Sequence, residues 1–369
     1  MSSLTRGRCA LRSQFNPHIA TQRQLHPFSR APRLFSTSAA SQAAKPKDEP
    51  STVTTPPANQ INAPSSTLPA PLDLPIILPA TAQTADKLKR LVTIGRAYLA
   101  FYKTGLKNVF RNYRASLPLR ASLGLPAYIP ISPPRKPSEH NASRKGLDMG
   151  RGQFQLVRRS ARDVRRMIPF TLILIICGEF TPLVIPIFGS AITPATCRVP
   201  GQVAKERESA SKRKNAAMRA HARVVEPSAL NPVSVGSKEE LSLLAEFASP
   251  RWVKEADSNA VLRACAVFGL VKSHERLGGV ALAGLVYRPR LQRYVEYLAI
   301  DDGMMRAGGG VKRLNADEVR IALDERGAGD VAALYAGEKV ERAERKWLES
   351  WLDVREGEVH STTGESRVL

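Results

Sequence analysis

The stretch IPFTLILIICGEFTPLVIPIFGSAITPATC, residues 168–197, decides how the rest of the chain is organised. Its thirty residues contain a single charged side chain, Glu179. About 20 apolar helical residues are enough to cross the roughly 30 Å hydrocarbon core of a bilayer. We therefore predict one membrane crossing here. The alternative is a buried helix of a soluble core, but Pro182, Pro186 and Pro194 would damage such a helix, whereas a membrane helix tolerates them.

Basic residues gather on both sides of this stretch. Residues 86–166 hold 19 Lys and Arg against four acids, residues 198–226 hold eight against three, and residues 227–369 hold 20 against 22. This distribution favours anionic lipid headgroups as a partner and, after them, ribosomal RNA beside a membrane. Contact with DNA is not expected. The predicted lipid or ribosome contacts are Arg158, Arg159, Arg162, Arg165, Arg166, Lys205, Lys212, Arg213 and Lys214.

The N-terminal region is typical of targeting and linker sequence. No acid precedes Asp48, while six arginines are spread among Ser, Thr, Ala and Leu, as in a mitochondrial transit peptide. We predict a transit peptide over 1–35, cut just after Phe35, with a basic disordered tail as the alternative. Residues 36–85 are rich in Pro, Ser and Thr and are predicted to be an extended, disordered linker that buries no core.

Helical periodicity dominates the remainder, and no run of strand periodicity competes with it. Residues 86–167 are predicted to form basic helices beside the membrane. One runs from Asp86, as its cap, to about Ser116, and a Pro-rich loop at 118–137 follows it. The second covers 153–167 and leads directly into the apolar stretch.

Residues 198–360 are predicted to be a helical domain, which begins with a polar helix over 203–225. Its other signals are the capping-box spacings at Ser237–Glu240 and Asn315–Glu318, the helix end at Gly327, and apolar stripes in 261–271, 291–298 and 340–351. The predicted fold class is therefore all-α, with one transmembrane helix followed by an all-helical domain.

Four parts of the sequence together are similar to one known family. They are FYKTGLK (101–107), RRSARDVRRMIPF (158–170), EF (179–180) with ITPAT (192–196), and residues 314–327 with WLESWLD (347–353). These parts resemble the leucine-zipper and EF-hand transmembrane family of the mitochondrial inner membrane, in particular its ribosome-binding domain. The resemblance implies a 14-3-3-like helical domain on the matrix side. The chain departs from the family in lacking an EF-hand, a long heptad repeat and therefore a calcium-sensing tail.

Glu179 is the candidate transport residue, because a carboxylate in hydrocarbon costs about 2.5–3.5 kcal/mol on insertion scales and needs a partner. Pro182 and Pro186 free backbone carbonyls nearby, which would help to line a cation path or merely kink the helix. The alternative role of Glu179 is a hydrogen bond in helix packing. No catalytic set, zinc spacing or phosphate loop is found, so we expect no enzyme, cofactor or metal site.

Two functions remain open from the sequence. The first, which the resemblance implies, is a single-pass mitochondrial inner-membrane protein that supports K⁺/H⁺ or Ca²⁺/H⁺ homeostasis and binds the mitochondrial ribosome. It would act as a homo-oligomer, because one helix cannot enclose a path. The second is a membrane-tethered ribosome receptor for protein insertion, without transport. A cardiolipin-binding morphology factor is a third reading. The flanking charges are equal, so they do not decide topology.

Overall fold

The computed structural model describes residues 55–57, 59–76, 83–126, 149–177, 193–225 and 234–365. All regular elements in these ranges are helical and none is a strand, which confirms the predicted all-α class. The predicted transit peptide lies outside the described residues. The α-helices are α1 (Thr84–Ser122), α2 (Arg151–Cys177), α4 (Pro200–Val225), α5 (Lys238–Phe247), α6 (Pro250–Glu255), α7 (Ser258–Val267), α8 (Arg288–Ala307), α9 (Ala316–Glu325) and α10 (Glu338–Glu365), with short turns η1 (Ser65–Thr67), η4 (Ala195–Cys197), η5 (Ala283–Tyr287), η6 (Val311–Arg313) and η7 (Val331–Leu334).

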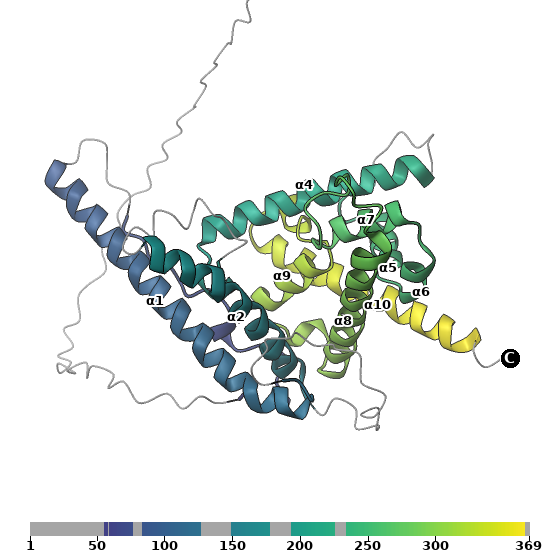
Figure 1. Cartoon of the computed structure of the whole chain (residues 1–369), viewed down its shortest axis with the longest axis horizontal. Coiled ribbons are helices and arrows are strands. Elements are labelled where there is room, and N and C mark those ends of the chain that lie inside the picture. The colour runs from purple at the N-terminus through teal and green to yellow at the C-terminus, as the bar shows by residue number, and fades with distance from the viewer. Residues whose placement is uncertain are drawn as a thin grey trace, which may run out of the picture. The chain divides into compact units, whose positions relative to one another are not determined.

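Helices α1 and α2 lie side by side and run in opposite directions (Figure 1). Phe101 and Tyr102 of α1 form a small apolar cluster with Phe170 of α2 and with Cys197. Gly105 makes this approach possible, because a Cβ atom there would lie 2.7 Å from Cys197 Sγ and 2.8 Å from a backbone oxygen. The predicted aromatic-rich helix before the apolar stretch is therefore the packing partner of the helix that enters it.

Both helices are longer than predicted. Helix α1 begins after Gln83, so Asp86 lies in its first turn rather than at its cap. It also continues through Pro118, where we expected a loop, because the surrounding turns are held by buried Ser116 and Arg120. Helix α2 likewise continues through a proline, Pro169, into the first residues of the apolar stretch.

The described residues at the two ends of the predicted membrane crossing lie close together. Asp163, five residues before the stretch, accepts a hydrogen bond of 2.9 Å from the backbone N–H of Ala195 near its end. Phe170 and Cys197 share the cluster described above. A helix that crosses the hydrocarbon core separates its ends by about 30 Å. The close approach of the described flanks differs from that separation, and residues 178–192, which join them, lie outside the described residues.

The part of the predicted linker that the structure describes also differs from expectation. Ile61 is buried in the main core, and Asn62 donates a hydrogen bond of 2.9 Å to the Arg313 carbonyl and accepts one from the Asn315 N–H. The Gly152 N–H donates to the Gln60 carbonyl at 2.9 Å. We call residues 59–76 the strap. It lies across α2 and the start of α9 instead of remaining free.

The main core is built by α4 to α10 as the apolar stripes predict. Leu291, Val295 and Leu298 of α8 are buried, and so are Trp347 and Trp351 of α10. Figure 1 shows α4 running over α7 and α9, and contacts between α4 and α7 agree with this view. This arrangement places the basic helices α2 and α4 on one helical core.

The predicted start of a helix at Ser237 and the predicted helix end at Gly327 are confirmed. The predicted side-chain cap at Asn315 does not form. The Glu240 N–H donates to Ser237 Oγ at 3.1 Å, as in the predicted capping box. Gly327 has φ +78°, the left-handed conformation that favours glycine after a helix end. Asn315 precedes α9 as expected, but its side chain makes no cap hydrogen bond, and Glu318 is used elsewhere.

Candidate functional site

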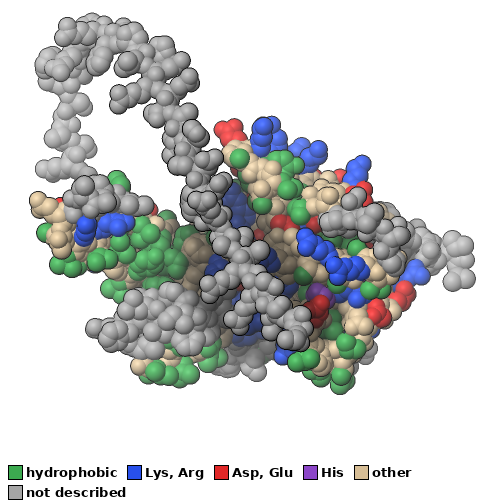
Figure 2. Space-filling view, turned by 90° about the horizontal axis from the view of Figure 1, so that it is seen from above, with side chains coloured by type: hydrophobic (Ala, Val, Ile, Leu, Met, Phe, Trp, Pro, Cys, Tyr) green, Lys and Arg blue, Asp and Glu red, His purple; other side chains and the backbone are tan. Residues whose placement is uncertain are grey.

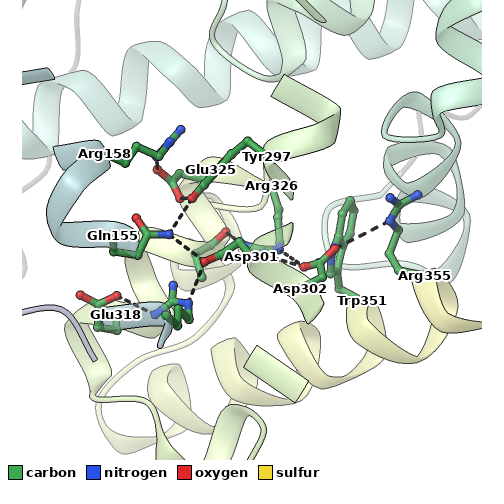
Figure 3. Close-up of polar contacts among 12 residues, drawn as sticks. Gln155, Arg158, Tyr297, Asp301, Asp302, Glu318, Glu325, Arg326, Trp351 and Arg355 are labelled. Atoms are coloured by element: carbon green, nitrogen blue, oxygen red, sulfur yellow. Dashed lines mark hydrogen bonds and ion pairs between the residues drawn. The ribbon is translucent and has the colours of Figure 1, made fainter. Parts of the chain in front are cut away.

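A buried network of charges joins α2 to the helical core (Figure 3). Arg159 forms a bidentate ion pair with Glu318 of α9, with distances of 2.6 and 2.9 Å. The same carboxylate accepts from Arg151 at 2.9 Å, and Arg151 also pairs with Asp301 of α8 at 2.8 Å. Because these side chains are almost fully buried, α2 is fixed to α8 and α9 by charge as well as by packing.

The network continues to α10. Arg326 pairs with Asp301 at 2.9 Å and with Asp302 at 2.6 Å, and Trp351 donates its indole N–H to Asp302 at 3.2 Å. Burial alone would raise the pKa of Asp301, but Arg151 and Arg326 outweigh that effect and hold the pKa below its ordinary value. Asp301 is therefore held in its charged form, and both Asp301 and Asp302 are paired with Arg326. Within the described ranges no group of His, Cys, Asp and Glu could hold a metal ion.

A second branch of the network involves Arg158. It pairs with Glu325 at 2.5 Å and lies 3.4 Å from the centre of the Tyr297 ring, and the Tyr297 hydroxyl donates to the same carboxylate. Burial raises the pKa of Tyr297 well above its ordinary value, so this hydroxyl remains protonated and a donor. Arg158 and Arg159, two predicted contact residues, therefore help to hold the fold together.

The other predicted contact residues divide between the interior and the surface. Lys214 is buried between Glu240 and Asp330, at 2.5 and 2.7 Å, and so serves the fold. Arg162 and Arg166 are half-buried, whereas Arg165 and Lys205 are exposed. The sequence could not distinguish the buried basic residues from the exposed ones, because helical spacing alone does not show how much of a basic helix other elements cover.

An exposed basic groove of about 600 Å³ runs along α4. Besides Lys212 and Arg213 it is lined by Arg219, Arg223 and Lys272. The last three form no hydrogen bond or ion pair with the part of the chain that the structure describes. Lys212 pairs only with exposed Glu208. We call this the α4 groove. It offers several solvent-accessible cations against one lining acid, Glu275, which suits a phosphate backbone.

The sequence analysis missed part of the α4 groove. Arg219 and Arg223 lie one and two turns beyond the predicted set on the same helix, and the i, i+4 spacing of the pair could have included them. Lys272 comes from the segment after α7, so only the packing of α7 against α4 brings it to the groove.

One end of the α1–α2 pair exposes apolar side chains. Leu172, Ile175 and Ile176 are exposed near the end of α2, and Leu88 and Leu91 are exposed near the start of α1. Because the two helices are antiparallel, these ends lie together. Figure 2 shows hydrophobic side chains gathered on the α1–α2 side, at the left. Exposed Lys87 and Lys89 flank them, so this end combines apolar and basic groups as a membrane-surface element does.

The candidate transport residues Glu179, Pro182 and Pro186 lie outside the described residues. None of the helices described here combines the length and the apolar character that crossing a bilayer requires. In comparisons with known proteins, no family model, curated protein or solved structure matches the chain.

Proposed function

We propose that this chain is a mitochondrial inner-membrane protein that holds the mitochondrial ribosome at the membrane. The resemblance to the leucine-zipper and EF-hand transmembrane family suggests this role, and the observation that carries it is the α4 groove. Arg219, Arg223 and Lys272 are basic side chains that line one groove and form no ion pair within the described residues. Cations that have no internal partner are available to ribosomal RNA phosphates.

The membrane attachment of this proposal differs from a single crossing. The apolar end of α1 and α2 enters the lipid, and both basic flanks stay on the side that carries the helical domain, the matrix side by resemblance. The Asp163–Ala195 hydrogen bond supports this arrangement, because it ties the two flanks together. Anionic lipid such as cardiolipin is then the expected partner of the exposed lysines near the start of α1.

The experiment is co-sedimentation of the full chain, in detergent, with mitochondrial ribosomes at several salt concentrations. The Arg219→Gln/Arg223→Gln variant should bind more weakly and lower the slope of log K against log salt by about two. The control is Lys339→Gln/Lys346→Gln, which removes the same charge from exposed positions of α10. Equal loss in both variants, or no binding by the unmodified chain, would remove the receptor proposal.

Cation/proton exchange is the second proposal, and it depends on the single carboxylate in the apolar stretch, Glu179. The proposed attachment places both flanks of the apolar stretch on one side of the membrane, and this is less favourable to a cation path formed by a single chain. Exchange would therefore need several copies of the chain around Glu179.

A further inference from the structure

A second cavity, which shares only Arg213 with the α4 groove, lies between α2, α4 and α9 and measures about 460 Å³. The strap closes it at Thr67, and the segment after α7 closes it at Phe268. The cavity exists only because the segments before and after the apolar stretch lie together, since α2 supplies one wall and α4 another. We call it the interhelix cavity.

Seven basic side chains line the interhelix cavity, and five of them form an ion pair with a carboxylate. Arg198 pairs with Glu206 at 2.6 Å, and Arg207 pairs with Asp324 at 2.9 Å. Arg158, Arg159 and Lys214 are paired as described above. Two lining cations, Arg162 and Arg213, form no ion pair within 4 Å among the described residues, although Asp163 lies near Arg162 and Glu206 near Arg213.

Arg162 is the clearer case of the two. Its Nε–H is buried and has no acceptor, and the side chain forms no hydrogen bond or ion pair with the described residues. The adjacent acid, Asp163, accepts the Ala195 N–H. Arg213 donates its Nε–H to the Ala266 carbonyl at 3.0 Å, and burial lowers its pKa. A partly buried guanidinium without a direct ion pair, and with a buried N–H that lacks an acceptor, is costly, so the cavity favours an anionic ligand.

The size and lining of the interhelix cavity restrict that ligand. Guanidinium groups match the oxygens of phosphate in a planar, two-donor geometry. A volume of about 460 Å³ falls in the range of small-molecule sites and exceeds what inorganic phosphate fills. Val203, Phe268 and Ile321 add apolar surface to the wall. The ligand therefore carries an organic group beside its phosphate.

We propose that the interhelix cavity binds a phosphate ester, with the phosphate held by Arg162 and Arg213. The ester has two sources with the same chemistry, a soluble nucleotide or the headgroup of an anionic phospholipid. Arg213 lines both this cavity and the α4 groove, whereas Arg162 lines the cavity and not the groove, so Arg162 distinguishes this site from the ribosome proposal.

The test measures binding of two probes to the full chain by titration calorimetry: ADP, and a short-chain phosphatidylglycerol below its micelle concentration. Saturable binding of either probe, competed by inorganic phosphate, is expected. Binding of ADP alone identifies a soluble ester, and binding of the lipid alone identifies a headgroup. Arg162→Gln should weaken binding about tenfold or more, the loss of a charge-assisted hydrogen bond.

The matched control is Arg219→Gln, which removes one positive charge from α4 outside the cavity and should leave probe binding unchanged. It should weaken ribosome binding, while Arg162→Gln should not, so the two proposals fail separately. Arg213→Gln provides a second variant for probe binding alone if Arg162→Gln lowers the melting temperature of the free chain, because Arg213 also lines the α4 groove. No binding of either probe, or equal loss in Arg162→Gln and Arg219→Gln, would overturn the phosphate site.

Discussion

Glu318 lies between Arg151 and Arg159, and one carboxylate on α9 thereby holds two arginines that are two turns apart on α2. The group is almost completely buried. In such a site the loss of one partner is costly, because the remaining charges stay away from water without compensation. The first prediction follows from this geometry.

Glu318→Gln should destabilise the full chain by about 3–5 kcal/mol, because it leaves two buried guanidinium groups without their shared anion. The measurement is urea unfolding in detergent. The control is Glu208→Gln, which breaks an exposed pair with Lys212 and should leave the unfolding midpoint unchanged. A Glu318→Gln variant as stable as the unmodified chain would contradict the network.

Asp301→Asn should show a stability defect that depends on pH. The folded-state pKa of Asp301 lies below its unfolded value, so its charge stabilises the fold above about pH 4 and loses that effect as pH falls further. The variant should therefore be much less stable than the unmodified chain at pH 7, and the gap should narrow at pH 3. A gap that stays constant over this range would mean that ionisation of Asp301 is not involved.

Single cysteines at exposed positions before and after the apolar stretch should report the same side of the membrane. Lys103→Cys on α1 and Lys205→Cys on α4 are suitable positions. In mitoplasts, a membrane-impermeant maleimide should label both or neither, because the Asp163–Ala195 contact keeps the two flanks together. Labelling of one position and protection of the other would restore the single crossing.

Glu179→Gln tests the exchange proposal directly, since it keeps size and hydrogen bonding but removes the proton-binding charge. If exchange is the function, potassium- or calcium-driven proton flux should be lost while ribosome binding and protein abundance stay normal. Mitochondria that carry only the variant and retain full flux would leave the carboxylate as a packing group.

Gly152→Ala should loosen the strap. A Cβ atom at position 152 would lie 2.5 and 2.7 Å from the backbone oxygens of Asn62 and Gln60, so the strap must move. We expect a loss of about 1–3 kcal/mol and faster protease cleavage within the strap. Gly201→Ala is the control, since nothing lies within 4 Å of the added Cβ. Equal cleavage rates in both variants would show that the contact is unimportant.

The helical core could be predicted from local pattern. Leu291, Val295 and Leu298 repeat at helical spacing, and all three are buried. Ser237 caps α5 because its hydroxyl meets the free N–H of the first turn. These features depend on residues only a few positions apart, so the sequence contains what is needed to find them.

The candidate sites could be predicted only in part, because they depend on distant pairing. Arg159 and Arg162 look alike in sequence, yet Arg159 forms an ion pair with a carboxylate 159 residues away, and Arg162 forms none among the described residues. Nothing near Arg159 signals that partner. Pro118 was expected to end α1, but packing of the following turn outweighs the local cost. Long-range contacts of this kind also placed Ile61 of the expected linker in the core.

The strap also determines the order in which parts of the chain can fold during synthesis. Its contact between Asn62 and the Arg313 carbonyl joins residues 251 positions apart. Closing a flexible loop of that length costs about 3 kcal/mol more than closing one of ten residues, if the cost grows as (3/2)RT ln n. The part of the strap that is synthesised early can therefore be secured only after α9 has been made and packed. While a ribosome still holds the residues beyond α8, the strap cannot form this contact, and the interhelix cavity that the strap closes stays open.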